Sequence, residues 1–260
     1  MVPLGDSPTV SKLKSNKSSP FGAIIAIVAV IGVGAIGWVL SRPPTIIKLD
    51  PASAVNLSAA GIVVGNPDAL VEVVEFADFE CPGCAYFATI EEPDIMAKLV
   101  ATGEMRFRFM DFPLDGHVNA VAAHNAAACA NDQGKFWEMH DAIYRTQDRW
   151  NTQATRTPKR ALKQIAGDAG LDVGIWEDCF DSGSKLPQIA ANRRAAEQLR
   201  VTQTPSFKIG DQLIPGSLSY DQMRQLVTAE KIRIMANQSI ETGKPVSADE
   251  AKKAAVPAVP

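Results

Sequence analysis

Two cysteines, Cys81 and Cys84, stand three residues apart and follow shortly after Leu70–Phe76, a stretch that is typical of a buried β-strand. On a helix, residues at this spacing lie on one face, with their Cβ atoms about 5–6 Å apart. A disulfide joins Cα atoms about 4.4–6.8 Å apart, so this pair can open and close one without backbone movement. The spacing therefore predicts a redox-active pair. The alternative is two small buried apolar residues.

The residues between the cysteines favour a reactive first thiol. With Cys81 as N-cap, Pro82 falls at the first helical position, where its missing N–H leaves no hydrogen bond unmade. The amides of Gly83 and Cys84 then point back at the Cys81 sulfur, and with the positive helix end they stabilise a thiolate. We therefore expect Cys81 to be the nucleophile and the shielded Cys84 to be the resolving thiol.

The residues around the cysteine pair resemble those of a known family. The run Glu75–Cys84 (EFADFECPGC) resembles the active-site corner of thioredoxin-fold disulfide oxidoreductases, in particular the DsbA-like branch. The resemblance covers roughly Gly61 to Asn237 and continues in Met105–Leu114 (MRFRFMDFPL), Ala123–Tyr144 (AHNAAACANDQGKFWEMHDAIY) and Thr202–Phe207 (TQTPSF). It implies an α/β thioredoxin fold with a helical subdomain inserted at about residues 115–200. Cys81 and Cys84 are its redox pair, and no cofactor is expected.

The resemblance also assigns roles to residues outside the cysteine pair. Glu75, six residues before Cys81, matches the buried acid that moves protons to and from the second cysteine. Burial raises the pKa of such a carboxyl, whereas a strand-end glutamate facing solvent is the alternative. Thr204 and Pro205 match a cis-proline loop that offers backbone groups to an extended substrate peptide. Pro82 and Gly83 are expected on the same substrate-binding surface.

One position departs from the best-known oxidases of this family. They carry a histidine between the cysteines that further stabilises the thiolate, and this chain has Gly83 there. The redox potential therefore stays open over the range from about −270 mV for thioredoxin to about −120 mV for DsbA.

The two remaining cysteines, Cys129 and Cys179, fall on predicted helices of the insertion. Some DsbA-like relatives carry a structural disulfide there, so the resemblance implies a bridge, and two unlinked core cysteines are the alternative. A zinc site usually needs two close pairs of Cys or His ligands, and only one cysteine pair exists, so no metal site is expected. His140 shares a helix face with Phe136 and Ile143, which favours a hydrogen-bonded core histidine.

An uncharged apolar stretch of 20 residues, Phe21–Leu40, is long enough to cross a bilayer as one helix. Three lysines before it favour a cytoplasmic N-terminal segment, residues 1–20. We expect an uncleaved single-pass anchor at 21–40, a linker at 41–60, the DsbA-like domain at 61–242 and a disordered tail at 243–260. A cleaved signal peptide is the alternative, although the apolar stretch is longer than usual for one.

Local patterns predict the elements of the domain. The expected elements are strands Leu70–Phe76 and Met105–Met110, a helix from Cys81 to about Thr102, a hairpin of Phe207–Ile209 and Gln212–Ile214, and a last helix opened by a Ser219/Gln222 capping box.

The sequence thus predicts a membrane-anchored thiol–disulfide oxidoreductase on the periplasmic or extracellular side that introduces disulfides into exported proteins. The resemblance implies reoxidation by a quinone-linked membrane partner, DsbB-like or vitamin K epoxide reductase-like. A net charge of −3 argues against a nucleic-acid partner. The alternatives are a tethered reductase or isomerase, and a non-catalytic chaperone or metal-delivery module.

Overall fold

The computed structural model describes residues 24–33, 43–50, 55–57 and 60–242 of the 260-residue chain. The chain divides into two units, Met1–Pro43 and Pro44–Pro260. In the first unit, residues 24–33 form a helix with exposed side chains. Within the described ranges, no helix is both long and apolar enough to cross a membrane. The rest of the predicted 21–40 anchor, residues 1–20 and the 243–260 tail lie outside the described residues.

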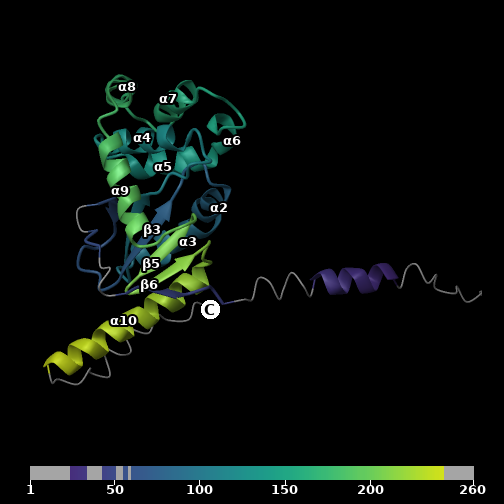
Figure 1. Cartoon of the computed structure of the whole chain (residues 1–260), viewed down its shortest axis with the longest axis vertical. Coiled ribbons are helices and arrows are strands. Elements are labelled where there is room, and N and C mark those ends of the chain that lie inside the picture. Colours follow the sequence, from purple (N-terminus) through teal and green to yellow (C-terminus); the bar gives the residue numbers. More distant parts are fainter. Residues whose placement is uncertain (1–23, 34–42, 51–54, 58–59, 243–260) are drawn as a thin grey trace, which may run out of the picture. The chain divides into compact units, whose positions relative to one another are not determined.

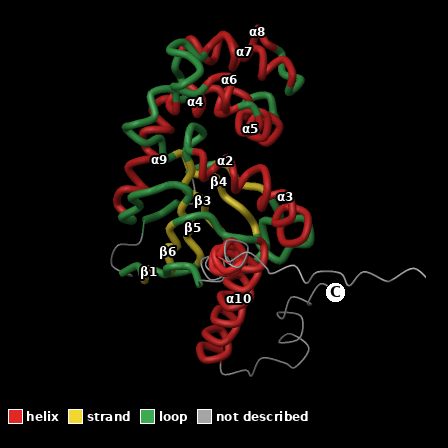
Figure 2. The backbone as a smooth tube through the Cα atoms, turned by 90° about the vertical axis from the view of Figure 1, so that its right-hand side faces the viewer, coloured by secondary structure: helices red, strands yellow, loops and turns green. Residues whose placement is uncertain are grey.

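The second unit is built on a six-stranded sheet with the order β1-β6-β5-β3-β4-β2 (Figures 1 and 2). The central strands β3 and β4 are parallel, and the other neighbouring strands are antiparallel. The strands are β1 (Ile47–Lys48), β2 (Ile62–Val64), β3 (Glu72–Ala77), β4 (Arg106–Asp111), β5 (Ser206–Ile209) and β6 (Gln212–Pro215).

Strand β3 is apolar along most of its length because both faces of the sheet are covered. Val73 packs in one cluster with Phe107 and Phe207, and its neighbour Val74 packs in a second cluster on the opposite face. The two strands expected from the sequence, Leu70–Phe76 and Met105–Met110, are confirmed to within two residues as β3 and β4.

The predicted helix from Cys81 connects these parallel strands. It runs as α2 (Pro82–Tyr86), η2 (Phe87–Glu91), α3 (Glu92–Ile95) and η3 (Met96–Val100), where η2 and η3 are π-helical. Proline lacks the N–H of the helical ladder and clashes with the carbonyl four residues earlier. Pro93 therefore accounts for the wider turn of η2 that precedes it. The sequence indicated the helix and its extent but not this change of pitch.

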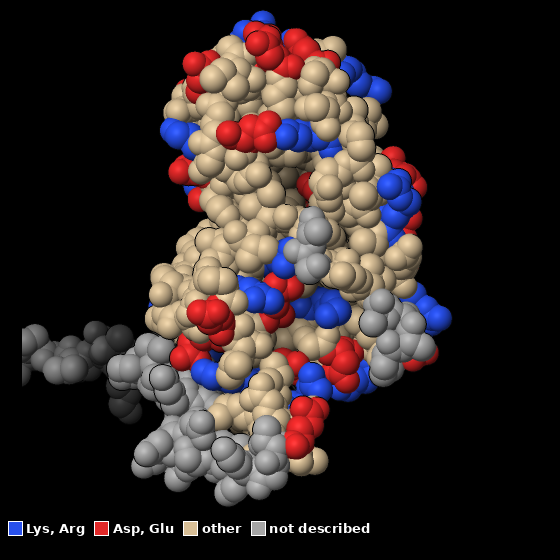
Figure 3. Space-filling model, turned by 90° about the vertical axis from the view of Figure 1, so that its left-hand side faces the viewer, with Lys and Arg blue, Asp and Glu red and all other residues tan. Residues whose placement is uncertain are grey.

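The predicted helical insertion lies between β4 and β5 in the chain, and its helices α4 to α8 gather at one end of the sheet (Figure 1). Acidic and basic side chains are interspersed over the face of the described residues in Figure 3. The helices of the insertion are α4 (Ala120–Asn131), α5 (Phe136–Arg145), α6 (Gln147–Trp150), α7 (Lys159–Asp168), α8 (Val173–Ser182) and α9 (Leu186–Gln198).

The predicted hairpin is confirmed as β5 and β6, with Gly210 at the turn in the left-handed region, φ 56°. A Cβ at this position would also overlap the Glu230 carboxylate, so both the backbone conformation and the available space require glycine. The capping box is confirmed as well. Ser219 N donates to Gln222 Oε1 at 3.0 Å and Gln222 N to Ser219 Oγ at 3.3 Å, opening α10 (Tyr220–Thr242).

Two strands differ from the sequence prediction. The linker expected at 41–60 contributes β1, which pairs with β6 through Ile47 and Leu213, and its Leu57 is buried. Strand β2 pairs with β4. With two and three residues, these edge strands are too short to carry an alternating pattern, so the sequence gives no signal for them.

Candidate functional site

The cysteine pair lies where β3 passes into α2. Cys81 is the N-cap, with φ −73° and ψ 123°, and Pro82 occupies the first helical turn as expected. Ala85 N donates to Cys81 O at 3.1 Å. Both thiols are free; 8% of Cys81 is exposed, whereas Cys84 is fully buried. An attacking thiol therefore reaches Cys81 and not Cys84.

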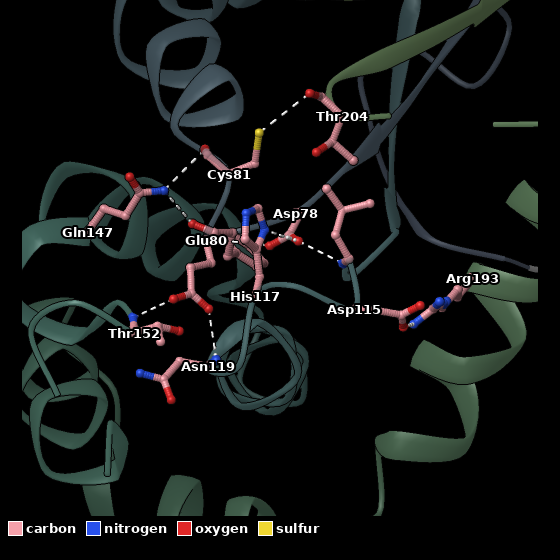
Figure 4. A network of polar contacts seen from close by, with 12 residues as sticks. Asp78, Glu80, Cys81, Asp115, His117, Asn119, Gln147, Thr152, Arg193 and Thr204 are labelled. Atoms are coloured by element: carbon pink, nitrogen blue, oxygen red, sulfur yellow. Dashed lines mark hydrogen bonds and ion pairs between the residues drawn. The ribbon is translucent and has the colours of Figure 1, made fainter. Parts of the chain in front are cut away.

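The predicted proline loop lies against this helix. The Thr204–Pro205 peptide bond is cis, and the Cys81 thiol donates to Thr204 O at 3.4 Å (Figure 4). A Cβ on Gly83 would lie 3.3 Å from Pro205 Cδ and 3.6 Å from Cys81 Sγ. The structure thus brings together the five residues Cys81, Pro82, Gly83, Thr204 and Pro205, and a side chain at Gly83 would be tightly placed.

The two thiols have opposite electrostatic surroundings. A hydrogen bond from the Cys84 thiol lowers the pKa of Cys81 to about 5; a Thr204 side-chain bond and the amides of Cys84 and Gly83 help, against the effect of burial. The Thr204 hydroxyl has no hydrogen-bond partner in the described structure while Cys81 is a thiol, so it is free to donate to a thiolate. Burial first, then the hydrogen bond and charge of Cys81, raises the pKa of Cys84.

Glu75 lies inside the sheet, between Phe109 of β4 and Phe207 of β5. Only 1% of it is exposed, so the solvent-facing alternative does not hold. Its Oε2 has no hydrogen-bond partner among the described residues. Burial, and then the charge of Cys81, raises the pKa of Glu75 to about 8. The carboxyl is therefore protonated at neutral pH and close enough to the cysteines to interact with them.

A polar network that the sequence analysis missed fixes the cysteine corner (Figure 4). Asp78 Oδ1 accepts from Glu80 N at 2.7 Å, while Oδ2 accepts from Leu114 N at 2.8 Å and lies 2.7 Å from His117 Nδ1. Gln147 Nε2 donates to Phe79 O at 2.8 Å and to Cys81 O at 3.1 Å. These bonds fix the turn from which the first cysteine projects.

Glu80 ties the same corner to the helical insertion. Its carboxylate accepts from Asn119 N at 2.8 Å and from Thr152 N. Hydrogen bonds to a buried carboxylate are among the stronger polar interactions in proteins. In the sequence, Asp78 and Glu80 alternate with apolar residues in the run Ala77–Glu80. This pattern was the signal that could have indicated buried carboxylates with hydrogen-bond partners.

Cys129 on α4 and Cys179 on α8 are joined by a disulfide with a Cα–Cα distance of 5.8 Å. It links two helices of the insertion, and Cys129 is buried. In the part of the chain that the structure describes, no three His, Cys, Asp or Glu side chains are grouped so as to hold a metal ion.

The family model described as thioredoxin matches residues 58–229. The chain is 25% identical over 220 residues to the probable disulfide bond formation protein D of Bacillus cereus, covering 84% of this chain and 99% of the relative. It is 24% identical over 170 residues to disulfide bond formation protein D of Bacillus subtilis, covering 65% and 76%.

Solved structures show the same fold. BdbD from Bacillus subtilis superposes with a TM-score of 0.57 at 20% identity, covering 73% of this chain and 98% of that one. Wolbachia pipientis alpha-DsbA1 gives a TM-score of 0.60 at 21% identity, covering 68% and 93%. The predicted thioredoxin fold with a helical insertion is confirmed. The chain belongs to the thioredoxin family and is a DsbA-like thiol:disulfide oxidoreductase.

Proposed function

We propose that this protein is an oxidase that introduces disulfides into exported proteins, with Cys81 as nucleophile and Cys84 as resolving thiol. The observation that carries the proposal is the opposite perturbation of the two thiols. The pKa of Cys81 is lowered to about 5, chiefly by the Cys84 hydrogen bond, whereas burial raises the pKa of Cys84. A stabilised thiolate favours the reduced pair, and a protein whose reduced form is stabilised gives its disulfide away.

The proposed reaction starts from the Cys81–Cys84 disulfide. A substrate thiolate attacks the Cys81 sulfur, the S–S bond breaks, and the released Cys84 thiolate takes a proton from Glu75. A second substrate thiolate then attacks the substrate sulfur of the mixed disulfide, and Cys81 leaves as a thiolate. Two electrons have passed from the two substrate sulfurs to the cysteine pair. Solvent takes up the substrate's protons and returns one to Glu75.

The substrate is proposed to dock as an extended strand beside Thr204 and Pro205, with Pro82 and Gly83 on the facing helix. Main-chain hydrogen bonds of this kind provide affinity without requiring one sequence. Tyr86 on α2 and Val118, next to His117, are more than half exposed and provide apolar surface for unfolded clients. This arrangement suits a protein that acts on many substrates.

The location and partners belong to the same proposal. Residues 21–40 anchor the chain in a membrane, residues 1–20 lie in the cytoplasm, and residues 61–242 act on the periplasmic or extracellular side. The Cys129–Cys179 disulfide supports an oxidising compartment. A quinone-linked membrane protein, DsbB-like or vitamin K epoxide reductase-like, reoxidises the pair. Finding the full chain in the supernatant after alkaline extraction of membranes would contradict the proposed membrane anchor.

The test of the catalytic proposal is oxidative refolding of a reduced, multi-cysteine client by the oxidised protein. Replacing Cys81 by serine is expected to abolish refolding. The reduced Cys84→Ser variant keeps the Cys81 thiolate but has no second thiol to release it, so mixing it with a client that already carries a disulfide is expected to trap a mixed disulfide at Cys81. The matched control replaces Cys129 and Cys179 together by alanine and keeps the activity. Refolding by the Cys81→Ser variant at the unmodified rate would refute the proposal. Reduction of client disulfides, without formation, would favour the reductase.

A further inference from the structure

A second buried acid lies on the same helical segment as the cysteines and has no part in the mechanism above. Glu92, on α3, is 3% exposed. Its Oε2 lies 3.8 Å from His140 Nε2, and His140, on α5, is fully buried. His140 Nδ1 in turn lies 3.0 Å from Asp141 Oδ1, a carboxylate whose side chain is 49% exposed. These three side chains lead from the interior to the surface, with a hydrogen bond between His140 and Asp141 and a gap of 3.8 Å between Glu92 and His140.

The outer end of this path opens into a surface cavity of about 320 Å³. Both Glu92 and Asp141 line it, together with apolar residues including Val64, Met96 and Trp137. Solvent protons therefore reach Asp141 directly. Apart from this opening, rings surround the path: His140 packs edge-on against Phe109 and Tyr144, with centroids 5.3 and 4.9 Å away. Its imidazole is thereby fixed in place.

The inner end of the path lies near the reactive cysteines. The charge of Glu75 acts on Glu92, and the charges of Cys84, Glu75 and Glu92 all act on the buried Tyr144 hydroxyl. Glu75 Oε2, Glu92 Oε2, His140 Nε2 and the Tyr144 hydroxyl have no hydrogen-bond partner among the described residues. Buried polar atoms in such a group are typically satisfied by internal water, which makes about three hydrogen bonds per molecule.

We propose that Glu92, His140 and Asp141 form a proton relay that connects Glu75 to solvent and so sets the rate at which Cys84 gains or loses its proton. The proposal rests on the proposed function of Cys81, Cys84 and Glu75. Glu92, His140 and Asp141 act through Glu75 and are positioning residues rather than catalytic ones.

The relay supplies the proton that Cys84 gains during disulfide donation and removes the proton that Cys84 loses during reoxidation. During disulfide donation, Glu75 protonates the Cys84 thiolate. The proposal includes an internal water between the unpartnered oxygens of Glu75 and Glu92, through which Glu92 then reprotonates Glu75. His140 reprotonates Glu92, and solvent restores His140 beside Asp141. During reoxidation each proton moves the opposite way. No electrons pass through the relay, since both electrons stay on the sulfur atoms.

The charges around Glu92 support this role. Burial raises the pKa of Glu92 to about 8, with His140 opposing the rise and the carboxylates Glu75 and Asp141 adding to it. Burial also disfavours the charged form of Asp141, yet the hydrogen bond and charge of His140, with Arg145, lower its pKa overall. The path thus runs from a protonated acid inside to an ionised one at the surface.

The experiment measures the reactions of the two cysteines as two successive kinetic phases. One equivalent of dithiobis(nitrobenzoate) is mixed with the reduced full-length protein, and nitrothiobenzoate release is followed by stopped flow. In the first phase the Cys81 thiolate attacks the reagent and releases one nitrothiobenzoate. In the second, Cys84 loses its proton, attacks the Cys81 sulfur and releases the other. The first phase reports on Cys81 alone, and the second reports on proton removal from Cys84.

For Glu92→Gln we expect an unchanged first phase and a second phase about tenfold slower near neutral pH. This factor is smaller than the roughly 10²–10⁴-fold contribution of a group that transfers the proton directly, because Glu92 acts through Glu75. The pH profile of the second phase should also narrow, since Glu75 then titrates without a coupled acid. Asp141 is half exposed, so Asp141→Asn should keep the fold. It should slow the second phase by a smaller factor than Glu92→Gln does. The matched control is Glu138→Gln, an exposed glutamate on α5, which should change neither phase.

Equal second phases in Glu92→Gln, Asp141→Asn and the unmodified protein would overturn the relay and leave the proposed function intact. If Glu92→Gln does not fold, Asp141→Asn alone decides. A missing first phase, or a missing second phase in the unmodified protein, would instead refute the proposed roles of Cys81 and Cys84.

Discussion

Replacing Glu75 by glutamine tests how strongly the buried acid destabilises the fold. Burial, followed by the Cys81 charge, raises its pKa from the ordinary 4.5 to about 8. Between these values the folded protein keeps a proton that the unfolded chain releases. Stability from this group is therefore complete below pH 4.5 and is lost as the pH rises through about 8. At pH 7 the loss is about 3 kcal/mol, at about 1.4 kcal/mol for each pH unit above 4.5.

Glutamine has nearly the same shape and cannot ionise. The Glu75→Gln variant should therefore be about 3 kcal/mol more stable at neutral pH and nearly equal in stability to the unmodified protein at the ordinary glutamate pKa. Glu92 also has a raised pKa, but it is present in both proteins and its effect cancels to first order. The assay is guanidinium unfolding, at the two pH values, of proteins whose Cys81–Cys84 pair is reduced, since this is the state in which the charge of Cys81 acts on Glu75. A stability difference that does not change with pH would refute the reasoning.

Three further predictions concern the cysteines. Replacing Cys129 and Cys179 by alanine should lower the free energy of unfolding in urea by about 4 kcal/mol, because the disulfide closes a loop of 50 residues, and disulfide exchange at Cys81 should continue. The ultraviolet thiolate absorbance of reduced Cys81 should titrate at about pH 5, and a midpoint at the ordinary value of 9.0 would contradict the site electrostatics. Thr204→Val should raise that midpoint, because it removes a side-chain hydrogen bond to the sulfur.

The sequence predicted those parts of the site whose causes are local. The spacing of Cys81 and Cys84 and the proline between them define a helix N-terminus by themselves, and Ser219 with Gln222 define another. The hairpin at Gly210 likewise follows from neighbouring residues. The family resemblance then supplied Thr204 and Pro205, which lie more than a hundred residues from Cys81 and which no local pattern connects to it.

The missed features depend on contacts between distant segments. His117 gains its partner Asp78 only because the insertion folds back over the cysteine corner. The sequence predicted His140 to be a hydrogen-bonded core histidine, and its full burial and its 3.0 Å hydrogen bond with Asp141 bear this out. The approach of Glu92 to His140 was not foreseen, because it depends on how two helices pack. Strand β1 exists only through pairing with β6.

If the stabilised Cys81 thiolate makes this protein a disulfide donor, the redox equilibrium of the protein against glutathione must favour the reduced pair. Thiol trapping at a series of glutathione ratios measures the fraction of the Cys81–Cys84 pair that is reduced. For a donor we expect a potential close to that of DsbA, about −120 mV. A potential close to that of thioredoxin, about −270 mV, would contradict it and make the protein a reductant or isomerase.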